Sequence, residues 1–358
     1  MKLMRRKHKF VLPLALFLLI SLYLIFASSN DDLTVTHSHD DIKESYNNFD
    51  LSNDLIVFLH FQKTGGSDWD RHLVHNLMHY DDKTNDWQNM CKLAPNKTKS
   101  NESLHKRKYK YKKYYCPRGS DKDFNRNDFV NNWYFSRQTF GWFCGLHADY
   151  ATLKICLNEI KRQNSFLGQV FFTTIIREPV RRYLSEWNHI KRGGHAWNRS
   201  KNICNQEIFV DRCLRPNQRI EEISLEQFIS CRNNIANNRQ TRMLADYGET
   251  DACNLFENEN KKDLVSNAKN VLRNLSFFAL NEYQKESQEL FEKIFKNKFR
   301  FKFKRDQSIN ETALTLINDL SRPVFEKIIN LNELDIELYE FAKNLFFKRL
   351  DFYRKNSL

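Results

Sequence analysis

Two apolar runs rich in β-forming residues, each followed by a turn and then by helical spacing, constrain the fold more than any other feature of this sequence. Residues 55–60 (LIVFLH) precede a glycine turn, after which Trp69 and Leu73 lie at helical spacing. Residues 170–176 (VFFTTII) precede Pro179, and proline suits the first position of a helix because its missing N–H has no partner there. Buried strands that alternate with helices predict an α/β fold with a central parallel sheet.

Later segments extend this pattern. The apolar spacing predicts that the first helix continues through Leu77 and Met78. The chain from Tyr80 to Trp133 is polar, and we interpret it as an irregular insertion. We expect further strands at 277–280 and 299–303, and further helices at 284–295 and 333–354.

The N-terminal segment predicts a membrane anchor. Residues 1–9 carry five Lys or Arg side chains, and residues 10–27 carry no charge. Eighteen helical residues rise about 27 Å, close to the hydrocarbon thickness of a secretory-pathway membrane, and preceding basic residues keep the N-terminus in the cytosol. A cleaved signal peptide is the alternative, because Ala27 is followed by two serines. We expect a cytosolic tail at 1–9, a transmembrane signal anchor at 10–27, a luminal stem at 28–52 and a globular luminal domain at 53–358.

The eight cysteines agree with a luminal domain. All follow the apolar span and none forms a CxxC pair, which fits disulfides in an oxidising compartment better than a zinc site. We expect a Cys91–Cys116 pair to tie down the insertion. Short loops close at modest entropic cost, so the local pairs Cys144–Cys156 and Cys204–Cys213 are also expected.

The charge balance points to a polyanionic partner. The chain has a net charge of +13 and a pI near 9.2, which suits nucleic acid, anionic lipid or a sulfated glycan. A luminal domain argues against nucleic acid. Five N-glycosylation sequons agree with the lumen, and they begin at Asn96, Asn101, Asn198, Asn274 and Asn310.

The segment 60–67 (HFQKTGGS) has the features of an anion-binding loop. It lies between a strand and the start of a helix, where Gly65 and Gly66 let the backbone approach an anion closely. Lys63 adds a cation and Thr64 a hydroxyl donor. The order differs from the Walker pattern, in which the lysine follows the glycines. An ordinary glycine turn with a solvated lysine is the alternative.

Arg177 and Ser185 form a second candidate anion site. Arg177 ends the second strand and Ser185 lies two helical turns later, so both could hold a phosphate at the carboxyl end of the sheet. The alternative pairs Arg177 with Glu178 or Glu186 and leaves Ser185 in solvent.

Four segments, in order along the chain, carry a resemblance to a known family. They are FLHFQKTGGS…RHLV at 58–74, GWFCGLHADY at 141–150, REPVRRYLSEWNHIKRG at 177–193 and NNRQTRMLAD at 237–246. Together they closely resemble the heparan sulfate 6-O-sulfotransferases over roughly residues 54–349. The resemblance implies one P-loop-like sulfotransferase domain on a Golgi type II membrane protein.

The family's reaction transfers a sulfuryl group from 3′-phosphoadenylyl sulfate to the 6-O position of glucosamine in heparan sulfate, with no metal. The resemblance implies that His147 is the base that takes the hydroxyl proton and that Lys63 stabilises the leaving phosphate. The implied donor contacts are His60, Phe61, Gln62, Lys63, Thr64, Gly65, Gly66, Ser67, Asp68, Arg177, Ser185, Arg305 and Thr312. The implied acceptor contacts are Lys112, Lys113, Arg137, Trp142, His189 and Trp197.

The chain departs from the family pattern in three places. Ser67 and Asp68 stand where the family has two threonines, and Asp68 brings a carboxylate near an anion site. His195 adds a residue before Trp197, and the loop at 303–312 aligns poorly.

Other functional classes remain open from the sequence. One is a non-catalytic heparan-binding protein on the same fold, and another is a sulfotransferase for a different glycan position. A glycosyltransferase would commonly show a D-x-D metal motif at a strand end, whereas the D-x-D at 121–123 lies in the insertion. The basic run at 105–113 (HKRKYKYKK) fits a solvated loop as well as a contact to a sulfated chain.

Overall fold

A computed structural model describes most of the chain from Phe49 onward. The described residues are 49–81, 85–93, 113–118, 132–139, 142, 144–145, 147–164, 168–194, 213–231, 234–246, 261–303 and 315–356. They belong to one compact unit that spans residues 44–358. The predicted tail, the predicted anchor and most of the predicted stem lie outside the described residues. No helix in the described part of the chain is long and apolar enough to cross a bilayer.

The centre of the molecule is a four-stranded parallel sheet. β1 (Leu55–Leu59) pairs with β6 (Tyr134–Phe135) on one side and with β7 (Val170–Ile176) on the other, and β8 (Phe277–Leu280) pairs with β7. Every residue of β1 and β8 is buried, as expected for strands covered on both faces. The predicted α/β fold with a central parallel sheet is confirmed.

Helices connect and cover these strands. They include α2 (Gly66–Asn76), α3 (Tyr150–Asn164), α4 (Pro179–Lys191), η5 (Ile220–Glu222), α5 (Leu225–Ser230), α6 (Arg239–Leu244), α8 (Lys261–Asn274), α9 (Gln284–Phe295), α11 (Arg322–Leu331) and α12 (Glu333–Lys355). The bounds predicted for α9 are confirmed, and α12 extends one residue beyond its predicted end.

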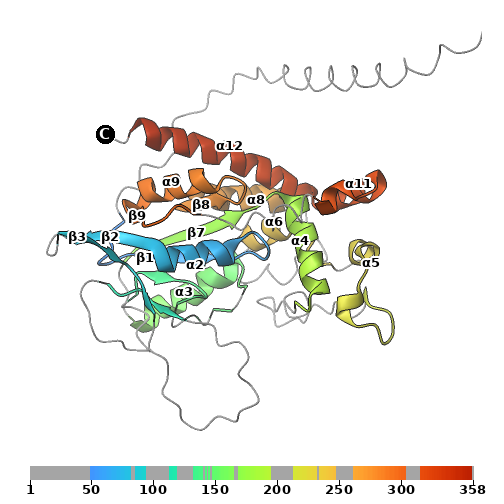
Figure 1. Ribbon diagram of the computed structural model, residues 1–358, viewed down its shortest axis with the longest axis horizontal. Coiled ribbons are helices and arrows are strands. Elements are labelled where there is room, and N and C mark those ends of the chain that lie inside the picture. The colour runs from blue at the N-terminus through green and yellow to red at the C-terminus, as the bar shows by residue number, and fades with distance from the viewer. Residues whose placement is uncertain are drawn as a thin grey trace, which may run out of the picture. The chain divides into compact units, whose positions relative to one another are not determined.

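Aromatic side chains show which helices cover which face of the sheet. Trp69 of α2 stacks on Phe277 of β8 with ring centroids 5.8 Å apart, and Phe291 of α9 lies edge-on to the same ring at 5.1 Å. Phe278, the next residue of β8, points to the opposite face and contacts Phe346 of α12. Therefore α2 and α9 cover one face, and α12 covers the other with α8 packed against it (Figure 1).

The first helix ends earlier than predicted. Leu77 adopts an extended conformation and begins β2 (Leu77–Asp81), which pairs antiparallel with β3 (Asp86–Asn89) and with β9 (Lys298–Phe299). The predicted strand at 299–303 is correspondingly reduced to β9. The insertion is not wholly irregular either, since it contains β3, β4 (Lys92–Leu93) and β5 (Tyr114–Tyr115).

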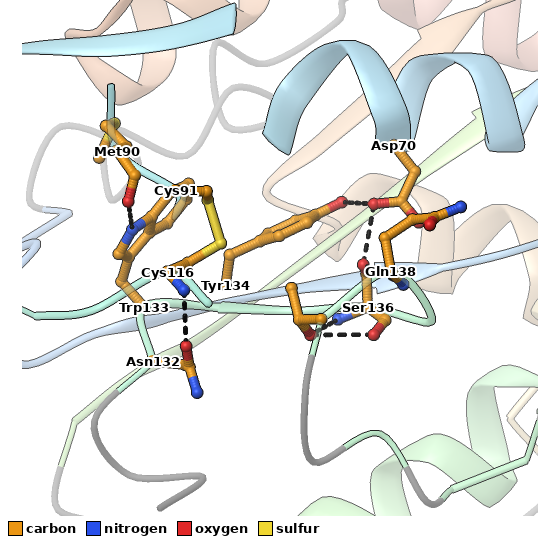
Figure 2. Close-up of a disulfide and its surroundings, with 10 residues drawn as sticks. Asp70, Met90, Cys91, Cys116, Asn132, Trp133, Tyr134, Ser136 and Gln138 are labelled. Carbon is orange, nitrogen blue, oxygen red and sulfur yellow. Dashed lines mark hydrogen bonds between the residues drawn. A yellow bond between two sulfur atoms is a disulfide. The ribbon is translucent and has the colours of Figure 1, made fainter. Parts of the chain in front are cut away.

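Three disulfides lie among the described residues. Cys91–Cys116 and Cys144–Cys156 form as expected, and the first joins the two sides of the insertion beside the indole of Trp133 (Figure 2). The predicted Cys204–Cys213 pair is wrong, because Cys213 is bonded to Cys231. The end of α5 brings the Cα atom of Cys231 within 5.3 Å of that of Cys213, and this proximity outweighs the shorter separation in sequence.

Candidate active site

The loop between β1 and α2 leads into the N-terminus of α2 at the carboxyl end of β1. Lys63 has φ 65° and Gly65 has φ 88°, so the backbone turns through the left-handed region at both positions. Gly65 is the N-cap of α2, and no side chain of the described residues caps it. The N–H of Asp68 donates to the carbonyl oxygen of Gly65 at 3.1 Å, and the N–H groups of Gly66 and Ser67, at the positive dipole end of the helix, are placed to bind an external anion.

Asp68 does not neutralise this site from within. It lies in the first turn of α2, and its carboxylate is 3.6 Å from the guanidinium of Arg71 on the exposed side of the helix. The departure from the family pattern at this position is thus compatible with an anion at the helix start.

Gly66 is required because the ring of His60 lies against it. A Cβ atom at position 66 would come within 2.8 Å of Cδ2 of His60, closer than side chains pack. Hence the two glycines have different roles. Gly65 permits a left-handed turn, and Gly66 admits an imidazole.

The loop between β7 and α4 is built differently. Glu178 is the N-cap of α4, and its carboxylate accepts hydrogen bonds from the backbone N–H groups of Val180 and Arg181, at 3.0 and 2.7 Å. Pro179 is the first helical residue, as predicted. Because this helix start is capped from within, an anion here depends on side chains.

Arg177 joins the two loops. Its guanidinium donates to the carbonyl oxygen of Lys63 at 2.8 Å, and its backbone N–H and C=O bond to the side-chain amide of Gln240 at 2.8 Å each. The two carboxylates considered as its partners have other contacts: Glu178 caps α4, and Glu186 forms ion pairs with Arg182 and Arg239. Ser185 is half-buried on the same helix.

His147 lies directly beside the first loop. Its Nδ1 is 3.3 Å from Nδ1 of His60 and 3.4 Å from the carbonyl oxygen of His60. Burial, reinforced by the positive charge of Arg137, lowers the pKa of His147 to about 4. Burial also lowers the pKa of His60 well below its usual range, with Arg137 acting in the same direction. Both rings are therefore neutral near pH 7, and a neutral imidazole can accept a proton.

Arg137 and Lys113, expected from the resemblance to contact the acceptor, also lie at this loop. Arg137 donates to the hydroxyl of Ser67, and Lys113 donates to the carbonyl oxygen of Arg137. Burial lowers the pKa of Lys113. The structure thus places residues predicted to contact the acceptor glycan next to Ser67, which is predicted to contact the sulfuryl donor.

The other predicted acceptor residues are described in part. Trp142 packs against Phe135 of β6 with tilted rings whose centroids are 4.6 Å apart, and its Nε1 donates to the carbonyl oxygen of Gly145 at 2.7 Å. His189, near the end of α4, lies so close to Gly194 that a Cβ atom there would be 2.4 Å from its ring. The positions of Lys112, Trp197, Arg305 and Thr312 lie outside the described residues.

Sequence reasoning missed a buried carboxylate beneath this site. Asp70 of α2 accepts hydrogen bonds from the hydroxyls of Tyr134 and Ser136, at 2.9 and 2.8 Å (Figure 2). Burial raises its pKa to about 6 against these hydrogen bonds and the nearby charge of Arg137. Asp70 thereby fixes the segment that carries Arg137. The sequence offered one sign of this buried carboxylate. Asp70 lies in a predicted helix next to Trp69 and Leu73, two apolar residues that the structure shows to be buried.

Gln240 was missed as well, and Glu186 was considered only as a partner of Arg177. Gln240 bonds to the backbone of Arg177, and Glu186 is a buried carboxylate held by Arg182 and Arg239. Both lie inside segments that the resemblance covers, so the segments were recognised but the contacts of these side chains were not.

The chemistry that this arrangement supports needs an anion and a base. Within the described residues, no group of three or more His, Cys, Asp or Glu side chains could hold a metal ion. The open start of α2, with Lys63 and Arg177 beside it, can hold a phosphate or sulfate ester. His147 can take a proton from a hydroxyl group brought to the same place.

Comparisons with known proteins agree with this reading. The model of the sulfotransferase family matches residues 49–342. Heparan-sulfate 6-O-sulfotransferase 2 of Danio rerio is 35% identical over 316 residues, which cover 84% of this chain and 60% of the relative. Heparan-sulfate 6-O-sulfotransferase 3 of Homo sapiens is 37% identical over 309 residues, which cover 83% of this chain and 58% of the relative.

The match to a third relative covers a larger share of that protein's length. Heparan-sulfate 6-O-sulfotransferase 1 of Cricetulus griseus is 35% identical over 319 residues, which cover 86% of this chain and 71% of the relative. The chain thus spans about 58 to 71% of the length of these relatives. The resemblance read from the four motifs is confirmed, and the chain belongs to the sulfotransferase family.

Proposed function

We propose that this protein transfers a sulfuryl group from 3′-phosphoadenylyl sulfate to the 6-O position of glucosamine residues in heparan sulfate. The observation that carries the proposal is the position of His147, a neutral imidazole in contact with the end of β1 where the anion-binding loop begins. Transfer of an anionic group to a hydroxyl requires a base close to an anion site, and His147 lies beside the anion-binding loop.

The donor fits the residues present. Bound 3′-phosphoadenylyl sulfate supplies the sulfuryl group and leaves as adenosine 3′,5′-bisphosphate. The uncapped start of α2 and Lys63 hold the phosphosulfate end, and Lys63 stabilises the charge that develops on the leaving oxygen. Arg177 and Ser185 hold the 3′-phosphate from the second loop, where the capped helix start leaves binding to side chains.

On the acceptor side, His147 takes the proton of the attacking hydroxyl and becomes an imidazolium. Lys113 and Arg137 bind sulfate or carboxylate groups of the chain, and Trp142 and His189 line the approach of the sugar. The net charge of +13 favours a polyanionic acceptor. We assign further acceptor contacts to Lys112 and Trp197, and donor contacts to Arg305 and Thr312, on the resemblance alone.

We place the protein in the Golgi membrane with a single N-terminal span and a luminal catalytic domain. The uncharged residues 10–27 after a basic tail, and disulfides at every cysteine among the described residues, support this topology. The full chain should stay with membranes on alkaline carbonate extraction and gain mobility after glycosidase treatment. Release into the soluble fraction would remove the anchor from the proposal.

The reaction is tested with the purified full chain, radiolabelled 3′-phosphoadenylyl sulfate and N-sulfated heparosan, with disaccharide analysis of the product. We expect label on the 6-O position of glucosamine, and at least about 100-fold slower labelling with the His147→Ala variant. Label at another position would assign a different glycan specificity. Binding of heparan sulfate without any label would favour the non-catalytic alternative.

A further inference from the structure

We infer that His60 is a positioning residue that holds His147 in the tautomer protonated at Nδ1, so that the lone pair of the base lies on Nε2. The inference rests on the proposed function, and it adds a role for His60 that is separate from donor binding. Free histidine favours the opposite tautomer, with the proton on Nε2. A base that acts through Nε2 therefore needs a partner that accepts a hydrogen bond from its Nδ1–H group.

The carbonyl oxygen of His60 sets the direction of the contact. It lies 3.4 Å from Nδ1 of His147, and a carbonyl oxygen only accepts hydrogen bonds. An unprotonated Nδ1 would turn a lone pair toward the lone pairs of this oxygen. The contact is favourable only when Nδ1 of His147 carries the proton.

The ring of His60 completes the arrangement. Its Nδ1 is 3.3 Å from Nδ1 of His147, and two protonated nitrogens cannot share one hydrogen bond. Given that His147 donates, Nδ1 of His60 accepts and the proton of His60 is on Nε2. His60 therefore presents two acceptors to one N–H group, its carbonyl oxygen and its ring nitrogen.

The far side of His60 matches this assignment. Its Nε2 is 3.4 Å from the hydroxyl oxygen of Ser67, which also accepts from Arg137. The N–H at Nε2 can donate to that oxygen, and the hydroxyl hydrogen of Ser67 stays available for an anion at the helix start. Gly66 leaves the room for this ring, because a Cβ atom there would collide with Cδ2 of His60.

The arrangement also affects the charged form of the base. When His147 becomes an imidazolium, its Nδ1 proton still points at two acceptors, which stabilise the new charge. The charged groups around it oppose one another: Arg137 and Arg239 disfavour the imidazolium, and Glu186 favours it. Lys63 and Arg137 both disfavour protonation of His60. His60 therefore stays neutral and able to accept.

The primary test measures the tautomer without any turnover. Nitrogen NMR of the full chain with labelled histidine distinguishes a protonated from an unprotonated ring nitrogen, and the His147→Gln variant identifies the signals of His147. We expect wild-type His147 to be protonated at Nδ1 near pH 7. Protonation at Nε2 would overturn the inference whatever the activity of the protein.

Two variants test the contribution of the ring. His60→Phe keeps a ring of similar size but removes its nitrogens, whereas His60→Asn returns an oxygen acceptor near the position of Nδ1. We expect His60→Phe to lower kcat about 10- to 100-fold, as the loss of orienting partners commonly does, and His60→Asn to recover most of this loss. We expect His60→Phe to raise the fraction of His147 protonated at Nε2, and His60→Asn to keep the tautomer of the wild type.

The outcomes separate this inference from the proposed function. An unchanged kcat and an unchanged tautomer in His60→Phe would overturn the role of the ring. Equal loss in both variants, together with weaker nucleotide binding, would reassign His60 to the donor site. A wild-type chain that shows the expected tautomer but sulfates no glycan would contradict the proposed function and leave the His60–His147 geometry standing.

Discussion

The two strand–turn–helix units, β1–α2 and β7–α4, lie side by side in one sheet and yet prepare their helix starts in opposite ways (Figure 1). The N-cap of α2 is a left-handed glycine with no capping side chain among the described residues. The N-cap of α4 is Glu178, whose carboxylate accepts hydrogen bonds from two backbone N–H groups. One helix start is left for a ligand, and the other is satisfied by the protein.

This difference separates backbone recognition from side-chain recognition. In the proposed function, the peptide groups of the first unit would bind the anion directly, which requires a helix start without an internal side-chain cap. At the second unit the proposal assigns the anion to the side chain of Arg177, so the cap on α4 does not compete with it. We expect substitutions in the first unit to affect both kcat and nucleotide affinity, and substitutions in the second unit to affect nucleotide affinity alone.

The largest effect should come from His147, which contacts only the first of these two loops in the described contacts. The His147→Ala variant should lower kcat by about 10²–10⁴, because the acceptor hydroxyl loses its general base. Affinity for adenosine 3′,5′-bisphosphate, measured by calorimetry, should be unchanged. More than half of the wild-type rate in this variant would remove His147 from the mechanism.

Lys63→Ala should reduce both kcat and nucleotide affinity. It removes a charge-assisted contact worth about 1.5–3 kcal/mol, or roughly 10- to 150-fold in a rate or equilibrium constant. Initial rates at saturating donor, together with calorimetry, separate the two effects. A loss of affinity with an unchanged kcat would mean that Lys63 does not act on the leaving group.

Arg177→Ala should instead weaken nucleotide binding by about 10- to 150-fold while kcat at saturating donor changes little. Arg177→Lys is the matched control, since it keeps the charge but not the planar guanidinium that also bonds to the carbonyl oxygen of Lys63. Unchanged affinity in both Lys63→Ala and Arg177→Ala would place the donor elsewhere.

The pH dependence of kcat should reflect the low pKa of His147. Its usual pKa of 6.5 is lowered to about 4, so the ring is neutral and competent above that value and is protonated below it. We expect kcat to be nearly constant from about pH 7 to pH 5 and to fall about tenfold for each unit below the pKa. An acid limb near pH 6.5 would show that the base is not desolvated as described.

The smallest effect concerns the cap of the second unit. Glu178→Ala should lower the free energy of unfolding by about 1 kcal/mol, because two N–H groups at the start of α4 lose their acceptor. Asp68→Ala in the first turn of α2 is the comparison, and its exposed ion pair with Arg71 should contribute only about 0–1 kcal/mol. Denaturant unfolding of both variants measures the difference. A larger loss for Asp68→Ala would reverse the contrast between the two helix starts.

Sequence patterns were sufficient where the interactions are local. The strand at 170–176 has the predicted bounds, and Pro179 begins a helix as its fixed φ angle favours. The pattern failed at Leu77, whose apolar spacing continues the helix although the residue begins β2. Leu77 pairs with Phe299 of β9, more than two hundred residues later, and the rest of β2 pairs with β3. Helical spacing carries no information about such partners.

The candidate site divides in the same way. The glycine loop, Arg177 and His147 could be identified from motifs, the Cys144–Cys156 pair from its short loop, and the Cys91–Cys116 pair from its position in the insertion. The contacts of Asp70 and the bond between Cys213 and Cys231 could not be identified in this way, because each depends on how the surrounding segments pack.

The sequence by itself determined the sulfotransferase family, the parallel α/β sheet and the chemical types of residue at its carboxyl edge, because periodicity and motif spacing are written along the chain. Only the tertiary structure decided that His60 and His147, 87 positions apart, meet through their Nδ1 atoms, and that one helix start is open while its neighbour is capped. The physical reason is that tautomers, pKa values and free N–H groups are set by burial and by the nearest acceptors. Those neighbours exist only once β1, β7 and the segment carrying His147 have packed together.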